Sequence, residues 1–385
     1  MTTKADTSVK FFHHAMPDAP VCSGTAGALI QLLDACLIDG FSVRTPDSVV
    51  VSDGVATVSI SAGNPYEKHA VVAISGASVS ALNAEWKIAS ADATAFTFAC
   101  PGVPDGAVTG ASAKRAGAGW AKPFSGENLA AYQSQDPTGT QLYLRINDTD
   151  ARYSQARGYE NMTDAAAGSG DFPQLSLISA ANFTWPKSDA ANSTARDWAI
   201  IADGAFMWVL IKAISTTGGG KLMHHFGDIV AFDPLDKYGC TITALRATAQ
   251  LTGANHAGAG KIGNTTGYGR FYARGVSQLG AAVQHGCEFA SNARWSGELA
   301  AAPLLSDKIH IAGPVFALAA GAAGTTARGR MPGAVCTIDA PTFADLTVVE
   351  QGDRAFLAVE SSATAGTTAP NSIGICLFDI KGPWR

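Results

Sequence analysis

The sequence predicts a mainly β protein of antiparallel sheets or a sandwich. It also predicts one short N-terminal amphipathic helix and an inserted small β-barrel or sandwich domain. Short apolar runs alternate with Asp-Gly, Gly-Asn and Ser-Gly turns over much of the 385 residues. The 41 glycines, with abundant Ala, Ser and Thr, suit loops between strands better than long helices. The clearest helical spacing lies near the N-terminus.

An N-terminal arm and helix, residues 1–45, is expected to be part of the main β domain. Five apolar residues between positions 24 and 39 recur at the i, i+3, i+4 spacing of one helical face. They are Leu29, Leu32, Leu33, Cys36 and Leu37. Gly40 follows as the expected C-terminal stop. Because the helix is short, we expect it to dock against a sheet.

Residues 46–114 are predicted to form the inserted domain. The segment 49–60, VVVSDGVATVSI, is expected to be a hairpin with Asp53 and Gly54 at its turn. Three further short strands are expected, at 70–74, 86–89 and 95–99. This spacing is typical of a small barrel or sandwich. A domain inserted in a loop whose two ends lie close together is tolerated on physical grounds.

A central antiparallel domain is predicted over residues 115–280. Segments 130–134 and 141–147 are expected to pair across the turn at 136–139. Segment 197–239 indicates a meander of three strands, because an Asp-Gly turn and a Gly-rich turn separate three apolar runs.

Residues 281–385 are predicted to form a C-terminal β region. Its expected strands are at 309–315, 346–350, 355–360 and 373–378. Just before this region, residues 251–269 form a long segment rich in Gly, Asn and Thr. Such a segment is unusual in a compact domain unless it is a binding or assembly loop.

Composition narrows the classes of function. Charged residues make up 15% of the chain, against roughly 25% in typical soluble domains, which suits a surface buried against neighbours. The net charge of -5 and the lack of a basic block argue against nucleic acid as a partner, since phosphate binding needs clustered Lys and Arg. No strongly apolar run of 18 residues is present, so no membrane span is expected.

The seven cysteines are scattered and contain no C-x-x-C pair, so neither a disulfide framework nor a zinc site is expected. They are Cys22, Cys36, Cys100, Cys240, Cys287, Cys336 and Cys376. We expect them to be small apolar core residues of a protein assembled in a reducing cytoplasm. The N-terminal residues lack a basic segment followed by an apolar one, so no secretory leader is expected.

Two glycine-rich patterns resemble nucleotide-binding loops. Residues 258–263 match G-x-G-x-x-G, but the following Asn264-Thr-Thr does not predict the helix that would hold a pyrophosphate. Residues 218–221 lack the spacing of a phosphate-binding loop, and a hairpin turn accounts for them. No cofactor is expected.

Histidines are the candidate metal ligands. His13-His14 and His224-His225 are adjacent pairs, and neighbours in a strand face opposite sides, so neither pair can chelate one ion from one face. A metal at the second pair would need Asp228 or a distant ligand, and partly buried, hydrogen-bonded imidazoles are the preferred interpretation. The segment His285-Gly286-Cys287 would place His and Cys on one strand face, but its glycine favours a turn.

Five carboxylates near two tyrosines are the candidates for glycan hydrolysis: Asp148, Asp150, Glu160, Asp164 and Asp171. Acid and base chemistry needs two carboxylates that converge across a sugar, and acidic loops are common on any surface. We therefore assign no catalytic, cofactor-binding or metal-binding residue. Candidate residues for surface contact, including non-catalytic glycan binding, are aromatic: Trp185, Trp198, Trp295, Tyr153 and Tyr159.

Several segments carry a family resemblance. They are LLDACLIDGF at 32–41, GWAKPFSGENLAAY at 119–132, LYLRINDT at 142–149, RGYENMTD at 157–164, WAIIADG at 198–204, FGDIVAFDPLDKYGC at 226–240, ARGRMPGAVC at 327–336 and the ending GPWR. Through them the chain resembles a family of virion structural proteins, tail-associated, of tailed bacteriophages that infect GC-rich Gram-negative bacteria. The inserted domain resembles small β domains of such proteins.

The resemblance implies a non-enzymatic virion protein of the tail tip, baseplate or a fibre attachment, which acts by subunit docking in a symmetric assembly. It implies assembly in the bacterial host cytoplasm and partners that are other copies of the chain and other virion proteins. Host surface glycan is a further candidate partner. One alternative is a capsid-exterior decoration or head-fibre protein, and another is a tail-borne glycan-binding or glycan-cleaving protein.

Overall fold

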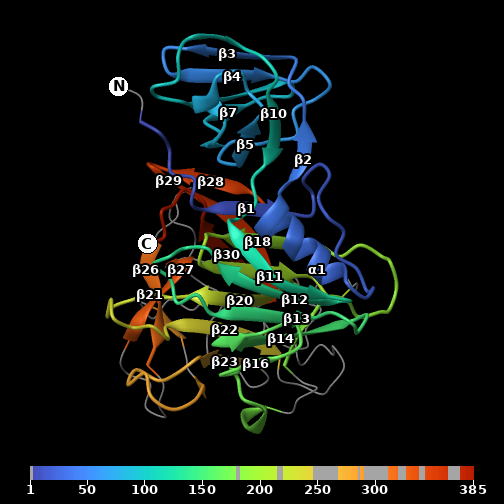
Figure 1. Cartoon of the computed structure of the whole chain (residues 1–385), viewed down its shortest axis with the longest axis vertical. Helices are drawn as coiled ribbons and strands as arrows, with labels where there is room; N and C mark the ends of the chain where they lie inside the picture. Colours follow the sequence, from blue (N-terminus) through green and yellow to red (C-terminus); the bar gives the residue numbers. More distant parts are fainter. Residues whose placement is uncertain are drawn as a thin grey trace.

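A computed structural model describes residues 3–178, 183–214, 220–245, 268–284, 287–289, 311–319, 327–337, 343–362 and 373–385. The protein is mainly β: 47% of the described residues lie in strands and 6% in helices, and the sheets are antiparallel. A small lobe lies above a larger body in Figure 1. The predicted fold class is therefore confirmed.

The larger sheet of the body has twelve strands. In spatial order its main path runs through β1 (Lys10–His13), β18 (Trp198–Ala202), β19 (Phe206–Ile211), β20 (Leu222–Asp228), β22 (Cys240–Leu245), β17 (Thr184–Pro186), β14 (Tyr153–Tyr159), β13 (Tyr143–Asn147), β12 (Leu129–Ser134) and β11 (Trp120–Gly126). Beside β22 lie β23 (Tyr268–Tyr272) and β24 (Val283–Gln284). The predicted pairing of two strands across the turn at 136–139 is confirmed as β12 and β13.

The predicted meander is the centre of the core. Strands β18, β19 and β20 pair in sequence, and every one of their residues is buried. Asp203 forms the first turn, where its Oδ1 accepts the backbone N–H groups of Ala205 and Phe206 at 2.8 and 2.7 Å. A short aspartate that bonds its own turn is the reason an Asp-Gly pair favours a hairpin.

The N-terminal helix is shorter than predicted. Helix α1 (Ala28–Leu33) continues directly into a π-helical turn, η1 (Asp34–Asp39), and ends at Gly40 with a φ of 71°. All five apolar residues of the predicted face have no exposed surface. None of the helices in the described part of the chain has the length and apolar character needed to cross a bilayer.

The small lobe is a two-sheet sandwich with its own hydrophobic core, and no closed barrel is found among the described residues. Its first sheet contains β7 (Ser90–Ala91), β8 (Ala95–Ala99), β4 (Val55–Ser59), β3 (Ser48–Ser52) and β9 (Gly106–Val108). Its second contains β2 (Phe41–Arg44), β10 (Ser112–Arg115), β5 (Val71–Ser75) and β6 (Glu85–Lys87), and η2 (Ser80–Leu82) is a short 3-10 turn. The lobe's strands thus begin at Phe41 and end at Arg115, whereas the predicted insert spans 46–114.

The two chain crossings into the sandwich lie side by side. The N–H groups of Ala118 and Gly119 donate to the carbonyls of Cys36 and Leu37 at 2.9 and 3.0 Å. A Cβ at Gly40 would lie 2.0 Å from the carbonyl oxygen of Arg115, so this approach requires a glycine. The geometry is that of a domain inserted between the helix and β11.

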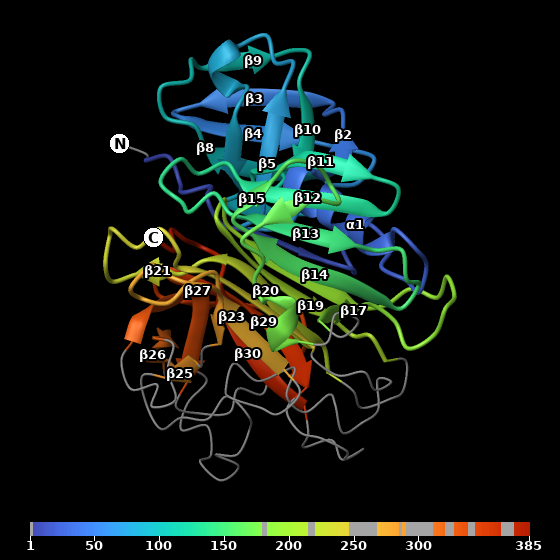
Figure 2. The same ribbon diagram turned by 60° about the horizontal axis from the view of Figure 1, so that its bottom comes forward.

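A seven-stranded sheet completes the body. It contains β25 (Cys287–Phe289), β26 (Ile311–Leu318), β27 (Ala327–Thr337), β30 (Ile373–Asp379), β29 (Arg354–Ser362), β28 (Val348–Gln351) and β21 (Val230–Ala231), which pairs with β27. The remaining elements are β15 (Asn161–Met162), β16 (Gly168–Ser169) and η3 (Leu175–Leu177). Strand β29 of this sheet lies beside β20 (Figure 2), and both sheets contribute to one core. Most of the predicted loop at 251–269 lies outside the described residues.

Candidate functional site

Two of the aromatic residues predicted to contact partners at the surface are core residues. Trp185 and Trp198 have no exposed surface, and their indole N–H groups donate to the carbonyls of Thr243 at 2.6 Å and Pro20 at 3.0 Å. The prediction is wrong for both, because a buried indole with a satisfied N–H contributes packing and cannot reach a ligand.

The other three aromatic candidates have different outcomes. Tyr159 is also buried, with 8% of its surface exposed, so its predicted role in surface contact is wrong. Tyr153 is half-buried against the guanidinium of Arg152, 5.0 Å from its ring. Trp295 lies outside the described residues.

Asp148, the first of the carboxylate candidates, is part of a buried polar network. Its Oδ2 accepts the N–H groups of Leu29 and Ile30 at 2.7 and 3.3 Å, and its Oδ1 accepts Ser154 Oγ at 2.5 Å and an ion pair from Lys187 Nζ. Both charged side chains are fully buried. Asp148, which directly follows β13, therefore caps the N-terminus of α1 from a distant part of the chain.

The remaining carboxylate candidates also have structural partners. Asp150 and Asp164 each accept two backbone N–H groups of their own turns. Glu160 forms a two-pronged ion pair with Arg274 at 2.6 and 2.5 Å, and Asp171 lies 3.7 Å from Arg157. These contacts account for each carboxylate as part of the scaffold.

The histidine pair at 224–225 faces both sides of β20, as its spacing predicts. The ring of His224 stacks on Trp185 at 5.4 Å, whereas His225 packs against Phe206 and Trp208. Burial lowers the pKa of His224 to about 3. Among the described residues, no group of three or more His, Cys, Asp or Glu side chains is arranged to hold a metal. The segments 258–263 and 285–286 lie outside them.

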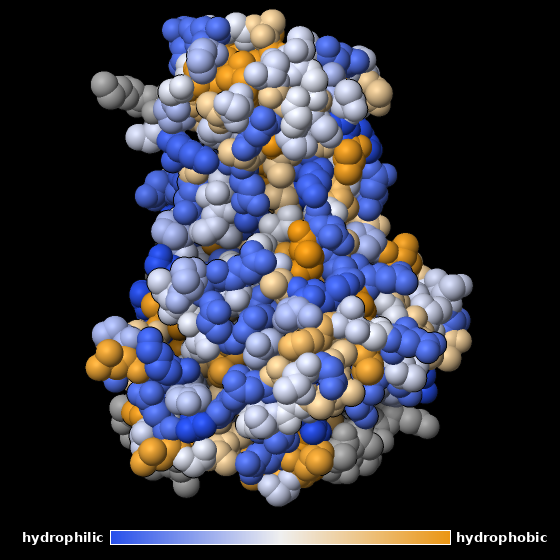
Figure 3. Space-filling view, viewed as in Figure 1, coloured by the Kyte–Doolittle hydropathy of each residue, from blue (hydrophilic) through white to orange (hydrophobic). Residues whose placement is uncertain are grey.

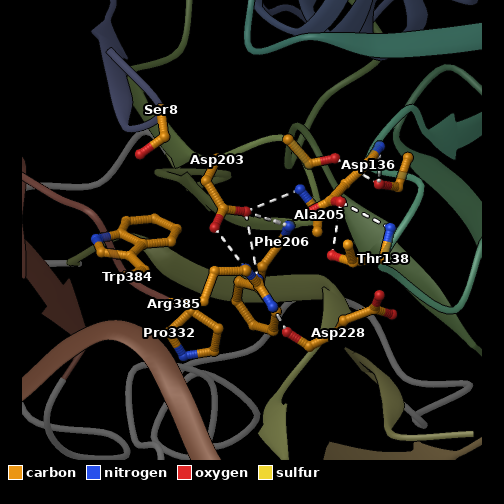
Figure 4. Close-up of polar contacts among 12 residues, drawn as sticks. Ser8, Asp136, Thr138, Asp203, Ala205, Phe206, Asp228, Pro332, Trp384 and Arg385 are labelled. Carbon is orange, nitrogen blue, oxygen red and sulfur yellow. Dashed lines mark hydrogen bonds and ion pairs between the residues drawn. The ribbon is translucent and has the colours of Figure 1, made fainter. Parts of the chain in front are cut away.

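Arg385 links the turn at Asp203 to the end of strand β20 (Figure 4). Arg385 Nε donates to Asp203 Oδ2 at 2.9 Å, and its second nitrogen donates to the backbone carbonyl of Asp228 at 3.1 Å. Beside it, Asp228 accepts the N–H and hydroxyl of Thr140 at 2.7 and 2.6 Å, and burial raises the pKa of this carboxyl. Thr140, Asp228 and Arg385 line a recess of about 400 Å³.

The recess is bordered by a loop that exposes large apolar side chains. We define two docking loops, residues 232–238 and 274–280. Phe232 is 53% exposed and Leu235 is 71% exposed in the first loop, while Val276 is 56% exposed and Leu279 is 76% exposed in the second. The first loop follows β21 at the left edge of the body in Figure 1. On the face shown in Figure 3, apolar patches lie among hydrophilic residues, one of them on the small lobe.

Arg328 of β27 and Arg274, the first residue of the second loop, hold the docking loops in place. Arg328 forms a two-pronged, nearly buried ion pair with Asp236 at 2.6 and 2.8 Å and also donates to the carbonyl of Arg274 at 2.7 Å. Arg274 is held by Glu160 and donates to the carbonyl of Gln278 at 3.1 Å. Gln278 in turn donates to the carbonyl of Leu235 at 3.1 Å, which ties the loops to each other.

Sequence reasoning missed these loops. The first lies within the segment FGDIVAFDPLDKYGC, where Phe232 and Leu235 stand among Asp and Pro residues that favour turns. Large apolar residues in a turn were the available signal. The second loop carries no comparable signal, since its position next to the first depends on pairing between β22 and β23.

Comparisons with known proteins do not assign the chain to a family. No protein-family model matches the chain, and no curated protein matches it.

Proposed function

We propose that the protein is a non-enzymatic structural protein of a tailed-phage virion, at the tail tip, baseplate or a fibre attachment. We further propose that it docks on other copies of itself through the two docking loops. The observation that supports docking is the exposure of four large apolar side chains, Phe232, Leu235, Val276 and Leu279, on loops held by ion pairs. The virion assignment is supported by the sequence resemblance alone.

The braced loops suit docking because rigid surfaces lose little conformational entropy when they bind. Exposed apolar side chains supply the favourable free energy, at roughly 25 cal/mol for each Å² removed from water. The ion pairs of Arg274 and Arg328 fix the loop backbones, so the exposed side chains have a defined arrangement before any contact forms.

Another copy of the chain is the proposed partner because the rim of the first loop carries both signs of charge. Asp233 and Lys237 are exposed, and no ion pair to either is formed among the described residues. In a two-fold contact the same surface patch meets itself, so Lys237 of one copy can lie opposite Asp233 of the other. Such a rim favours self-association over contact with a surface of one sign.

Analytical ultracentrifugation of the purified protein tests the docking step. Wild type is expected to self-associate, and the double variant Leu235→Asp, Leu279→Asp is expected to weaken association by about a hundredfold or more, since each buried leucine contributes roughly 1.5–3 kcal/mol. Val43→Asp is the matched control, because Val43 is 61% exposed on the sandwich. A wild type that stays monomeric, or a double variant that associates like wild type, would refute self-docking.

Gold labelling of a tagged copy on intact particles tests the virion assignment separately. Label at the tail tip, baseplate or fibres supports it, and label on the capsid exterior favours the decoration alternative. Particles without label would contradict a virion role, whatever the ultracentrifuge shows.

A further inference from the structure

A second cavity, of about 290 Å³, lies on the seven-stranded sheet. Strands β26, β27 and β29 and the segment 379–384 form its walls. Two of the segments that carry the family resemblance, ARGRMPGAVC and GPWR, meet here. Neither the docking loops nor the proposed assembly uses this cavity.

An irregularity in strand pairing creates the cavity. Pro314 of β26 pairs with Val335 of β27, but two residues later Phe316 pairs with Arg330. Four residues of β27 therefore lie opposite a single residue of β26, and the strand bulges away from its neighbour. Bulges of this kind are found where a sheet redirects side chains toward a site.

The bulge is packed against Trp384. Gly333 has a φ of 70°, and a Cβ there would lie 2.3 Å from the indole ring. Only a glycine permits this approach without displacing the ring. The indole N–H donates to the carbonyl of Asp379 at 2.8 Å, which fixes the ring as a wall of the cavity.

The cavity has a positively charged group without a partner. Arg330 lines it, is exposed, and forms no hydrogen bond or ion pair through its guanidinium among the described residues. Arg354 lies at the cavity with 40% of its side chain exposed and pairs with Asp379 at 3.1 Å. Asp379 also accepts the N–H groups of Lys381 and Gly382, so its charge is already compensated. The lining thus has one uncompensated positive charge.

We propose that this cavity binds a carboxylate-bearing sugar, a hexuronic acid unit. A free guanidinium matches a carboxylate with two parallel hydrogen bonds. Pro314 and Pro383, which are half-buried and exposed respectively, offer apolar surfaces for the C–H face of a sugar ring, and the buried ring of Trp384 lies behind them as part of the wall. The volume of about 290 Å³ lies just below the roughly 300–1,000 Å³ usual for ligand pockets, which suits one ring.

Isothermal titration of the full chain with glucuronate, galacturonate, glucose, galactose and acetate tests the proposal. The uronates are expected to bind at least about tenfold more tightly than the neutral sugars, because a charged hydrogen-bond pair is lost without the carboxylate. Added NaCl is expected to weaken uronate binding by screening. The absence of saturable uronate binding at millimolar concentration, or acetate binding as tight as uronate binding, would overturn it.

Three variants separate the guanidinium from general effects of charge. Arg330→Met keeps the aliphatic stem and is expected to weaken uronate binding about tenfold or more, and Arg330→Lys is expected to fall between Met and wild type. Arg44→Met, on β2 of the sandwich, is the control and should bind like wild type. Unchanged near-UV circular dichroism shows that the Arg330 variants are folded, and undiminished binding by folded Arg330→Met contradicts the site.

Titration of the protein with an oligogalacturonate identifies the source of the sugar. Tighter binding of the oligomer than of the monomer identifies a unit within an acidic polysaccharide, whereas equal or weaker binding identifies a free sugar acid. Both results support the site, provided that monomer binding depends on Arg330.

Discussion

Replacement of Asp148 by alanine is predicted to lower the free energy of unfolding by about 4 kcal/mol. The carboxylate and its partner Lys187 are fully buried, and the same carboxylate accepts two N–H groups at the start of α1. The variant would leave an ammonium group inside the protein without a counter-charge. It would also leave the first turn of the helix without its acceptor.

The magnitude follows from these two losses. Breaking a buried ion pair by removing one partner costs about 3–5 kcal/mol, and loss of a helix N-terminal acceptor costs about 1 kcal/mol. The two losses share one carboxylate and are not additive, so we take about 4 kcal/mol. Asp164→Ala removes only the acceptor of an exposed turn and should cost less than about 1 kcal/mol.

Urea unfolding followed by near-UV circular dichroism measures both variants, with free energies from linear extrapolation. The double variant Asp148→Leu, Lys187→Met should recover much of the loss, because a buried pair replaced by apolar groups is often near neutral. A cost below about 1 kcal/mol for Asp148→Ala would refute the buried network. So would loss of polysaccharide cleavage in an Asp148, Asp164 variant of unchanged stability, since that result would assign the carboxylates to catalysis.

Three further predictions concern packing, pH and the inserted lobe. Gly158→Ala should lower the free energy of urea unfolding by about 1–3 kcal/mol, because a Cβ there would lie 2.2 Å from the ring of Phe172. A Cβ at Gly204 would meet open space, so the control Gly204→Ala should change this free energy by no more than about 0.5 kcal/mol. Equal losses of stability in the two variants would contradict the packing at Gly158. Burial lowers the pKa of His13 to about 4 and of His224 to about 3, so the unfolded chain binds their protons first as pH falls below 6.5. The free energy of unfolding should therefore fall from pH 6.5 toward pH 4, by up to about 1.4 kcal/mol per pH unit for each histidine. His13→Gln should remove one of these two contributions. If the pH dependence of stability is unchanged in that variant, His13 is not buried as the structure shows. Deletion of residues 46–114 should leave a body that unfolds cooperatively in a thermal melt, because the two chain crossings into the sandwich lie side by side. An aggregated product without a cooperative transition would show that the body depends on the sandwich for its stability.

Local features of the fold were predictable because their causes are local. The buried face of α1 follows from apolar residues three and four positions apart, and the turn at Asp203 follows from a side chain that bonds its own backbone. The sandwich was visible as short strands at regular spacing. None of these inferences needs to know which distant segment lies nearby.

The candidate site was not predictable for the opposite reason. Trp185 and Trp198 are buried because carbonyls of distant residues accept their N–H groups, which their sequence neighbours do not reveal. The docking loops come together only because β23 pairs with β22, and Glu160 reaches Arg274 from a third part of the chain. The spacing of residues within one segment does not show which distant segments that segment contacts.

The pairing of charged groups decides which residues remain for binding. A guanidinium that already has a carboxylate partner contributes to the scaffold, and one without a partner is available to a ligand. Arg328 and Arg330 stand two positions apart on β27. Arg328 is nearly buried and held by Asp236, whereas Arg330 is exposed and faces a cavity without such a partner among the described residues. The same strand therefore supports the docking loops through one arginine and offers a binding group through the other, so Arg328→Met should weaken self-association while uronate titration of that variant should match wild type.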